Sequence, residues 1–299
     1  MLAPAVVVAL AGQQVELPRR PVFRSQVKLT TVTATVLDAT GALVTGLTRD
    51  AFDVYEDGDL QPIAQFTNER VPVSLAVLLD VSDSMFGRRL QDAREALDHF
   101  VAELLKRGDE YAVVAFNHRQ QVLTSWTSDP WLAGETTAHL KPFGSTAIYD
   151  AIVAALPLAA TRSRQRAALL VISDGADTAS DITLRDTRSA MLRSDAFVYA
   201  VGLDSSDRRP INAAVNATAL AEITHQSGGR TKIVRSSADL AAALNEIAEE
   251  LNSQYLIGYS SPKLDDGHYH TIRVRVRGAN YRVRARNGYV AEPRNPVRD

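Results

Sequence analysis

The sequence predicts an α/β fold: a doubly wound, mostly parallel sheet together with a β-sandwich formed by the N- and C-terminal segments. Between 71 and 253, short apolar runs alternate with amphipathic helical segments. Repeated strand–helix units of this kind form an open, mostly parallel sheet with helices on both faces. Strand-like patterns occupy 24–70 and return at 254–292. The chain of 299 residues suits about two domains, so we expect an α/β domain inserted into a β domain.

The first β segment contains short strands separated by turns. Strands are expected at 27–37, 52–55 and 62–66, with a further apolar stretch at 43–47. The turn-forming Asp38-Ala39-Thr40-Gly41 follows the first strand, in which β-forming residues alternate. Nothing in this segment is long and periodic enough to predict a helix.

The middle of the chain supplies the alternating units. Apolar runs that suit strands buried on both faces occur at 73–79, 111–116, 167–173, 197–202 and 231–234. Apolar residues at helical spacing predict helices near 90–105, 146–160, 184–193, 217–226 and 237–252. Strands and helices therefore follow one another in the order that a doubly wound sheet requires.

The last segment returns to the strand pattern. We expect strands at 255–259, 268–277, 281–286 and 289–290. Neither β piece has enough strands to be stable alone, so 24–70 and 254–292 should pair into one split β-sandwich. Two separate small β modules are the alternative, which is disfavoured because each would leave open strand edges. The tail, 293–299, is expected to be disordered.

The composition argues against several classes of protein. Lys and Arg number 33 against 35 Asp and Glu, a formal charge of −2, so there is no basic excess of the kind that nucleic-acid binders carry. The chain has no cysteine, which removes disulfides and thiolate metal sites. No stretch approaches the roughly 18 consecutive apolar residues of a membrane-spanning helix, so we expect no integral membrane segment.

Residues 1–23 are interpreted as a signal remnant and linker. The apolar stretch 1–12 ends in Ala9-Leu10-Ala11, a small-x-small pattern of the kind that signal peptidases cut. No Lys or Arg precedes the apolar part, so an ordinary apolar N-terminus is the alternative. The pattern predicts export to the periplasm or the extracellular space.

Oxygen-bearing side chains gather where the predicted parallel strands end, which is where open α/β sheets bind ligands. Asp80, Ser82 and Ser84 follow the first of these strands. Asp174 follows the third, and Thr146 opens the helix that precedes it. This set has none of the imidazole or thiolate that zinc or copper prefers. It predicts a Mg²⁺ site, which Mn²⁺ or Ca²⁺ could also fill.

Each of these residues also has a simpler explanation. Ser82 and Ser84 could cap the helix that follows them, and Thr146 could cap its own helix. Asp at the end of a strand is common as well. Because five such residues in order at strand ends are much less expected by chance, the pattern favours a metal site.

The series Asp80-x-Ser82-x-Ser84, Thr146 and Asp174-Gly175 resembles the metal-ion-dependent adhesion site of von Willebrand factor type A domains. The domain that carries this resemblance is the α/β domain expected at 71–253. It implies that Ser82, Ser84 and Thr146 bind the metal directly, whereas Asp80 and Asp174 hold it through water. It also implies that the under-neutralised cation captures an Asp or Glu of a partner protein.

The layout outside this domain is similar to that of bacterial proteins described as von Willebrand factor type A-related. The similar segments are 47–58, 255–259 and 284–289. Asp83 departs from the family, which usually has Gly there. Asp tolerates left-handed backbone conformations, while its charge could weaken an acidic partner or help to hold the cation. Asp177 could also point into the site.

Two further groups of residues are weaker candidates. We interpret His268 and His270, on one strand face, as a solvent-facing pair. Six arginines alternate along an expected last hairpin: Arg273, Arg275, Arg277, Arg282, Arg284 and Arg286. They could grip a phosphate chain or an acidic surface, although such stripes are more often the solvated face of an edge strand. The usual phosphate-binding loops, GxGxxG at the first strand–helix turn and GxxxxGK[ST], are absent from the sequence.

These observations predict a non-enzymatic, metal-dependent protein-binding module of the adhesion type. The alternative is a Mg²⁺-dependent hydrolase or phosphotransferase, in which Asp83 or Asp177 would have to act as the base. A third hypothesis is a structural module whose metal stabilises the sheet edge. No nucleophile–base pair is recognisable beside the metal-site residues, which favours binding over catalysis.

Overall fold

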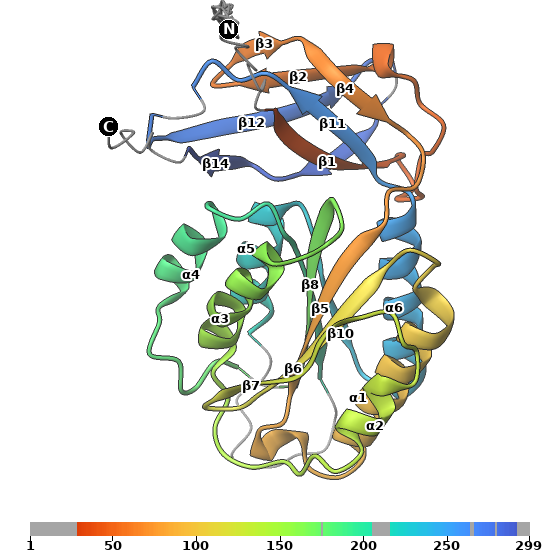
Figure 1. Ribbon diagram of the computed structural model, residues 1–299, viewed down its shortest axis with the longest axis vertical. Helices are drawn as coiled ribbons and strands as arrows, with labels where there is room; N and C mark the ends of the chain where they lie inside the picture. Colours follow the sequence, from red (N-terminus) through yellow and green to blue (C-terminus); the bar gives the residue numbers. More distant parts are fainter. Residues whose placement is uncertain (1–28, 175, 205–215, 264–265, 279, 292–299) are drawn as a thin grey trace, which may run out of the picture.

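The structure, a computed structural model, describes residues 29–174, 176–204, 216–263, 266–278 and 280–291. An α/β part with a six-stranded sheet is joined to a part made of two four-stranded sheets (Figure 1). The predicted export signal around Ala9-Leu10-Ala11 and the predicted tail at 293–299 lie outside the described residues. None of the described helices has both the length and the hydrophobicity needed to cross a bilayer.

The six-stranded sheet contains the apolar strands that the sequence predicts. Its members are β5 (Val73–Asp80), β6 (Glu110–Phe116), β7 (Gln120–Thr127), β8 (Arg166–Ser173), β9 (Phe197–Leu203) and β10 (Thr231–Val234). They lie in the order β10-β9-β8-β5-β6-β7, and each neighbouring pair is parallel except β6 and β7. The doubly wound α/β class is therefore confirmed. The strand β7 is not predicted, because its mostly polar sequence at the sheet edge lacks a continuous apolar run.

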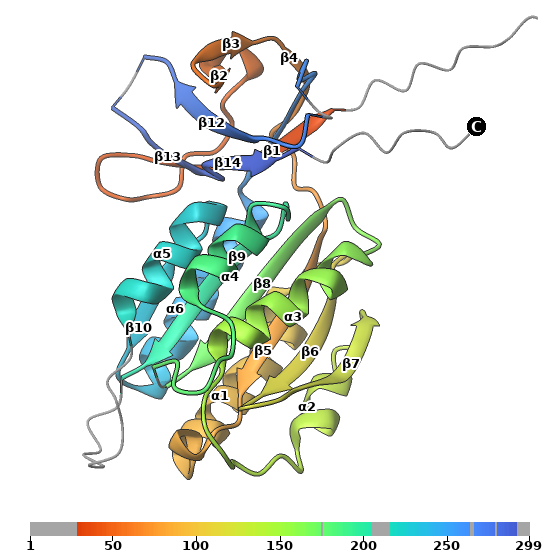
Figure 2. The ribbon, with the colours of Figure 1, turned by 90° about the vertical axis from the view of Figure 1, so that its left-hand side faces the viewer.

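Helices cover both faces of this sheet (Figure 2). One face carries α1 (Arg88–His99), which continues as a π-helix at Phe100–Leu104, α2 (Leu132–Thr137) and α6 (Ser237–Asn252). The other face carries α3 (Ile148–Ala160), α4 (Leu184–Met191) and α5 (Ala217–Ser227). Five of these six helices lie near their predicted positions, whereas the short α2 is not predicted.

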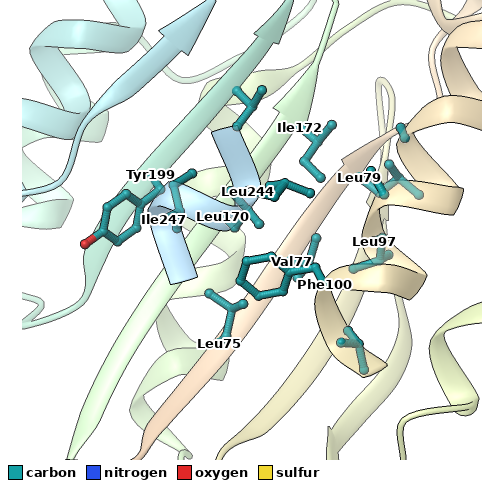
Figure 3. Close-up of a cluster of buried hydrophobic side chains, with 14 of the residues drawn as sticks. Leu75, Val77, Leu79, Leu97, Phe100, Leu170, Ile172, Tyr199, Leu244 and Ile247 are labelled. Carbon is teal, nitrogen blue, oxygen red and sulfur yellow. The ribbon is translucent and has the colours of Figure 1, made fainter. Parts of the chain in front are cut away.

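The side chains of β5 alternate between two cores because successive residues of a strand point to opposite faces. Leu75, Val77 and Leu79 belong to the core under α1 and α6, whereas Ala76 and Leu78 belong to the core under α3 and α5. Figure 3 shows the first of these cores, in which side chains of β5 and β8 meet those of the two helices. Burial on both faces is the reason why the central strands are continuously apolar.

Two antiparallel sheets form the other part. The first has the order β13-β1-β11-β4 and the second β14-β12-β2-β3. Their strands are β1 (Thr30–Leu37), β2 (Phe52–Glu56), β3 (Asp59–Gln61), β4 (Ile63–Thr67), β11 (Tyr255–Tyr259), β12 (Tyr269–Val276), β13 (Arg282–Ala285) and β14 (Gly288–Val290). A single-turn 3₁₀ helix, Arg49–Ala51, precedes β2.

Both sheets combine strands from the two ends of the chain. β1 pairs with β11 and β2 pairs with β12, and the sheets bury one core that includes Val32 and Val54 together with Ile257 and Val274. The predicted β-sandwich of N- and C-terminal segments is therefore confirmed. The boundaries at 70/71 and 253/254 remain predictions.

The predicted last hairpin is wrong. β12 pairs with β2 and β14, whereas β13 pairs with β1 in the other sheet. The expectation of a solvated arginine stripe holds for Arg273 and Arg275, which are exposed, but not for Arg284. Arg284 Nη2 donates instead to the buried carboxylate of Glu250 in α6, because β13 lies at the junction with the α/β part.

The predicted solvent-facing histidine pair is also wrong in one member. His268 is exposed, but His270 is buried. The Nδ1 atom of His270 lies 2.8 Å from Asp57 Oδ2, and its Nε2 atom lies 3.0 Å from Asp266 Oδ1. The two carboxylates satisfy both ring nitrogens, which lowers the free-energy cost of burying the imidazole.

Candidate metal site

Three loops at the carboxyl edge of the six-stranded sheet carry the five predicted metal-site residues. One loop joins β5 to α1, one precedes α3, and one follows β8. This edge lies at the end of the α/β part that is farther from the β-sandwich (Figure 1). The position agrees with the rule that open α/β sheets bind ligands beyond the carboxyl ends of their strands.

The structure brings all five residues into one hydrogen-bonded group. Thr146 Oγ1 donates to Ser82 Oγ at 2.9 Å, and Ser82 Oγ lies 2.9 Å from Ser84 Oγ. Ser84 Oγ in turn donates to Asp174 Oδ1. The carboxylate of Asp80 accepts from the backbone N–H of Ser82 at 2.8 Å. A row of four oxygens therefore runs across the three loops, with Asp80 beside it.

Backbone contacts hold the loops at this spacing. Asp83 N donates to Gly144 O and Phe143 N donates to Val81 O, each at 2.9 Å. Gly144 has φ +78, and a Cβ atom there would lie 2.5 Å from His118 Nδ1. A larger residue at this position would therefore be strained and would disturb the loop that carries Thr146.

Burial raises the pKa values of both carboxylates of the site. Asp80 is 0% exposed, and this burial raises its pKa to about 6, although hydrogen bonds from Ser173 and Ser82 act in the opposite direction. The charge of Asp174 adds to the rise. Burial also raises the pKa of Asp174, against the effect of Ser84 and Arg89. Both side chains would gain from a nearby cation, because it would stabilise their ionised forms.

Arg89 is a member of the site that the sequence pattern alone does not identify. Its Nη1 atom donates to Asp174 Oδ2 at 2.7 Å and to the backbone oxygen of Ser84 at 2.6 Å. Arg89 lies in the first turn of α1, five residues after Ser84. An arginine at that distance from the hydroxyl motif was the available signal, but only the fold shows that it meets Asp174.

The capping explanation for the hydroxyl residues is not supported by the contacts. Neither α1 nor α3 has a side-chain cap from Ser82, Ser84 or Thr146. At the start of α3, Asp177 Oδ1 accepts from the backbone N–H of Ile148 at 2.7 Å. Asp177 thus serves the helix terminus rather than the row of hydroxyls, contrary to the expectation that it points into the site.

Exposed aromatic side chains lie on the same loops. Phe86 and Phe143 are 62% and 57% exposed. A groove of about 490 Å³, lined in part by Phe86, Leu90, Leu140 and Pro142, adjoins them. Asp83 is exposed as well. Gly175, the last residue of the predicted motif, lies outside the described residues.

The donor chemistry fits a hard divalent cation. The converging side chains are hydroxyls and carboxylates, and oxygen is the ligand that Mg²⁺ and Ca²⁺ take. Across the described parts of the chain there is no group of three or more His, Asp or Glu side chains suited to a metal. A cation at this edge would therefore depend on the hydroxyls of Ser82, Ser84 and Thr146.

Comparison with known families matches residues 75–176 to the family model for the von Willebrand factor type A domain. Among curated proteins, the chain is similar to inter-alpha-trypsin inhibitor heavy chain H4 of Sus scrofa. The two are 22% identical over 196 residues, which cover 62% of this chain and 21% of that protein. The chain thus spans about a fifth of the length of this curated relative.

Among the solved structures that are similar in fold, two illustrate the likeness. A von Willebrand factor type A protein from Catenulispora acidiphila has a TM-score of 0.54 and 14% identity, over 90% of this chain and 76% of that chain. Proximal thread matrix protein 1 from the mussel byssus, with a zinc-occupied MIDAS motif, has a TM-score of 0.53 and 15% identity. That match covers 64% of this chain and 48% of that chain. At such identities the likeness concerns the fold alone.

Proposed function

This chain contains a von Willebrand factor type A domain, and on that premise we propose that it is a non-enzymatic protein-binding module of the adhesion type. A divalent cation at the candidate metal site would capture an Asp or Glu of a partner protein. The observation that carries the proposal is the row of hydrogen-bonded oxygens from Thr146 through Ser82 and Ser84 to Asp174.

The resemblance to the metal-ion-dependent adhesion site implies how the residues would hold Mg²⁺, or Mn²⁺ or Ca²⁺ in its place. Ser82, Ser84 and Thr146 would bind it directly, and Asp80 and Asp174 would hold it through water. Both oxygens of Asp80 already accept hydrogen bonds, from Ser82 N and from the hydroxyl of Ser173, which suits an indirect role. When bound, the cation supplies a positively charged coordination position that a carboxylate can complete.

The surface around the site suits a protein partner. Phe86 and Phe143 project from the loops that carry the hydroxyls and are largely exposed, and aromatic side chains are enriched in protein interfaces. A partner segment with an acidic side chain among apolar ones would match both the cation and these two aromatic side chains. The exposed carboxylate of Asp83 would disfavour a partner with several adjacent acidic residues.

A Mg²⁺-dependent hydrolase or phosphotransferase is less well supported. Its base would have to be Asp83 or Asp177. Asp177 accepts hydrogen bonds from the backbone of α3 and from Ser180 Oγ, so it is engaged in holding the helix start. This engagement favours binding over catalysis.

Export is a separate part of the proposal. Its support is the apolar stretch that ends in Ala9-Leu10-Ala11. Fractionation of cells that express the full sequence tests it: we expect the protein in the periplasm or the medium, and recovery in the cytosol alone would contradict export.

A metal-dependent capture experiment tests the binding function. Immobilised protein is loaded with Mg²⁺, exposed to an extract of the source organism, and eluted with EDTA. We expect an EDTA-released partner that the Thr146→Ala variant does not capture, and a synthetic peptide of that partner with a central Glu should compete whereas its Gln version should not. Absence of any partner that depends on both EDTA and Thr146 would contradict the proposal.

Variants of the exposed aromatic residues beside the site, Phe86 and Phe143, extend this test. Phe143→Ala should lower partner capture roughly tenfold, since an exposed aromatic anchor at an interface is worth about 1–2 kcal/mol. It should leave Mg²⁺ binding unchanged. Trp131→Ala is the matched control: Trp131 is 73% exposed, and it adjoins Asp129, which contacts Tyr111 at the start of β6, away from the metal edge.

A further inference from the structure

We propose that Arg89 is a positioning residue that weakens cation binding at the candidate metal site by supplying an internal positive charge to Asp174. The inference rests on the proposed metal-dependent function and extends it to the regulation of metal loading. Arg89 would keep Asp174 paired when the cation is absent and would shift metal loading to higher cation concentrations.

The contacts of Arg89 place its charge directly on the site. The guanidinium donates from Nη1 to Asp174 Oδ2 at 2.7 Å and to the backbone oxygen of Ser84 at 2.6 Å. The other oxygen of Asp174, Oδ1, receives the Ser84 hydroxyl. Asp174 is therefore shared between the guanidinium on one side and the row of hydroxyls on the other.

Burial makes this charge effective. The side chain of Arg89 is 13% exposed and that of Asp174 is 1% exposed. A pair so little exposed is screened by solvent and salt much less than a surface pair. The two carboxylates and Arg89 together carry one negative charge, whereas without Arg89 they would carry two.

Two consequences for cation binding follow, and they have the same sign. A divalent cation among the hydroxyls would lie near the guanidinium, and the two positive charges would repel each other. In the absence of a cation, Arg89 already stabilises the ionised Asp174, so the cation gains less from binding. Both effects lower the affinity for the cation, and the extra positive charge leaves the loaded site more attractive to a carboxylate.

The neighbouring Arg88 offers a matched control. Its side chain is 87% exposed and lies 3.8 Å from Asp92 in the same helix. Arg88→Gln removes the same charge from the adjacent position, without removing a contact to the site. Arg89→Lys keeps the charge at Arg89 and changes the shape of the donor.

Titration calorimetry with Mn²⁺ and with Mg²⁺ alone, at a fixed and mildly alkaline pH, tests the proposal. Arg89→Gln and Arg89→Met should each lower the dissociation constant by roughly tenfold or more, because a nearby charge in a partly buried site interacts by over about 1.4 kcal/mol. Arg89→Lys and Arg88→Gln should stay within about threefold of the wild type. Circular dichroism in EDTA checks that each variant folds.

The outcomes separate the two proposals. If the wild type binds metal and the neutral Arg89 variants bind it equally or more weakly, the role of Arg89 is wrong while the metal site stands. If Arg89→Lys tightens binding as much as Arg89→Gln, the shape of the donor matters rather than its charge, and the proposal is again wrong. If neither the wild type nor any variant binds metal, the proposed function itself fails.

A measurement on the wild type covers the case in which the neutral variants, Arg89→Gln and Arg89→Met, fail to fold. The side-chain Nε–H resonance of Arg89, assigned by its loss in Arg89→Lys, should shift when Mg²⁺ is added, because the cation disturbs the contact with Asp174. The resonance of Arg88 should stay in place. An unmoved Arg89 resonance at a cation concentration that saturates the site would overturn the proposal.

Discussion

Buried carboxylates lie at both ends of the α/β part, and they differ in how their charge is compensated. At the metal edge, the guanidinium of Arg89 pairs with Asp174, and burial raises the pKa values of both Asp80 and Asp174. At the end that meets the β-sandwich, the single carboxylate of Glu250 accepts from Arg284 and lies 3.2 Å from the Nε atom of Arg230.

The surroundings of Glu250 show what full compensation looks like. Its Oε1 atom accepts from the hydroxyl of Tyr199 at 2.9 Å and from Thr35 Oγ1 at 3.3 Å. These partners come from β9, β1 and β13 and meet at α6, so the carboxylate ties the two parts of the molecule together. Because these partners already compensate the charge of Glu250, the carboxylate needs no additional cation.

An exposed carboxylate, Asp57 in the hairpin turn of β2 and β3, is likewise compensated by its neighbours. Asp57 accepts from Lys263 Nζ at 2.9 Å and lies 2.8 Å from His270 Nδ1. Hydrogen bonds from Lys263 and His270 hold the pKa of Asp57 well below its usual range. The contrast teaches that a buried acidic residue marks a ligand site only where the protein leaves its charge incompletely balanced.

The largest predicted effect concerns Glu250. Glu250→Ala should destabilise the protein by roughly 3–5 kcal/mol, because removing one member of a buried ionic network leaves its partners uncompensated. Urea unfolding with and without Mg²⁺ measures the loss, which should be equal in both conditions. The exposed neighbour Glu249 provides the control: a Glu249→Ala variant as unstable as Glu250→Ala would refute the contrast.

The second predicted effect is a gain in stability when Asp80 is replaced. Ionised Asp80 is unfavourable in the folded protein, since its pKa is about 6 there against an ordinary value of 3.8. The unfolded chain loses this proton first as the pH rises, so stability in EDTA should fall between about pH 4 and pH 6. Asp80→Asn should remove the fall and raise stability near neutral pH by about 1–3 kcal/mol.

The same Asp80→Asn variant should lose the stabilisation that Mg²⁺ gives the wild type, about 2.7 kcal/mol at a hundredfold excess over the dissociation constant. Thermal unfolding with and without Mg²⁺ measures two quantities: the stability in EDTA and the stabilisation that the cation adds. Asp83→Asn, in the same loop but exposed, should change neither by much. A less stable Asp80→Asn protein in EDTA would show that the charge of Asp80 is already balanced.

The smallest effect concerns Asp57 and His270. The lowered pKa of Asp57 gives stability that is present above its unfolded value and is lost as the pH falls. Burial opposes the charged His270, but the hydrogen bonds that its ring donates to Asp57 and Asp266 outweigh burial and raise its pKa, so that contribution is lost as the pH rises through the raised value. The cluster should therefore stabilise most between about pH 4 and pH 6.5.

Asp57→Asn should reduce this stabilisation by about 1 kcal/mol, because the cluster is partly exposed and screened. Asp57 has φ 50, a conformation that Asn also tolerates, so the backbone should not change. Unfolding as a function of pH in EDTA gives the measurement, with Asp59→Asn as the exposed control. An unchanged pH profile would mean that solvent cancels the charge interactions of Asp57.

Prediction from the sequence succeeded where neighbouring residues decide the outcome. The strands β5 and β8 are apolar throughout most of their length because both of their faces are buried, and α6 begins and ends at its predicted residues. Ser82 and Ser84, two residues apart, were recognisable as a motif because a short loop holds them together. The polar edge strand β7 was missed because it has neither property.

By itself the sequence determined the α/β class and the β-sandwich of the two end segments, and it predicted the five residues of the candidate metal site, since periodicity and short motifs are local properties of the chain. Only the tertiary structure decided which charges meet. Asp174 lies 85 residues from Arg89 and Asp177 lies 29 from Ile148, and Arg284, predicted in a solvated stripe, donates to Glu250 instead. Such pairings depend on how strands and helices pack, and the energy of a charge depends on its burial, neither of which an alternating pattern records.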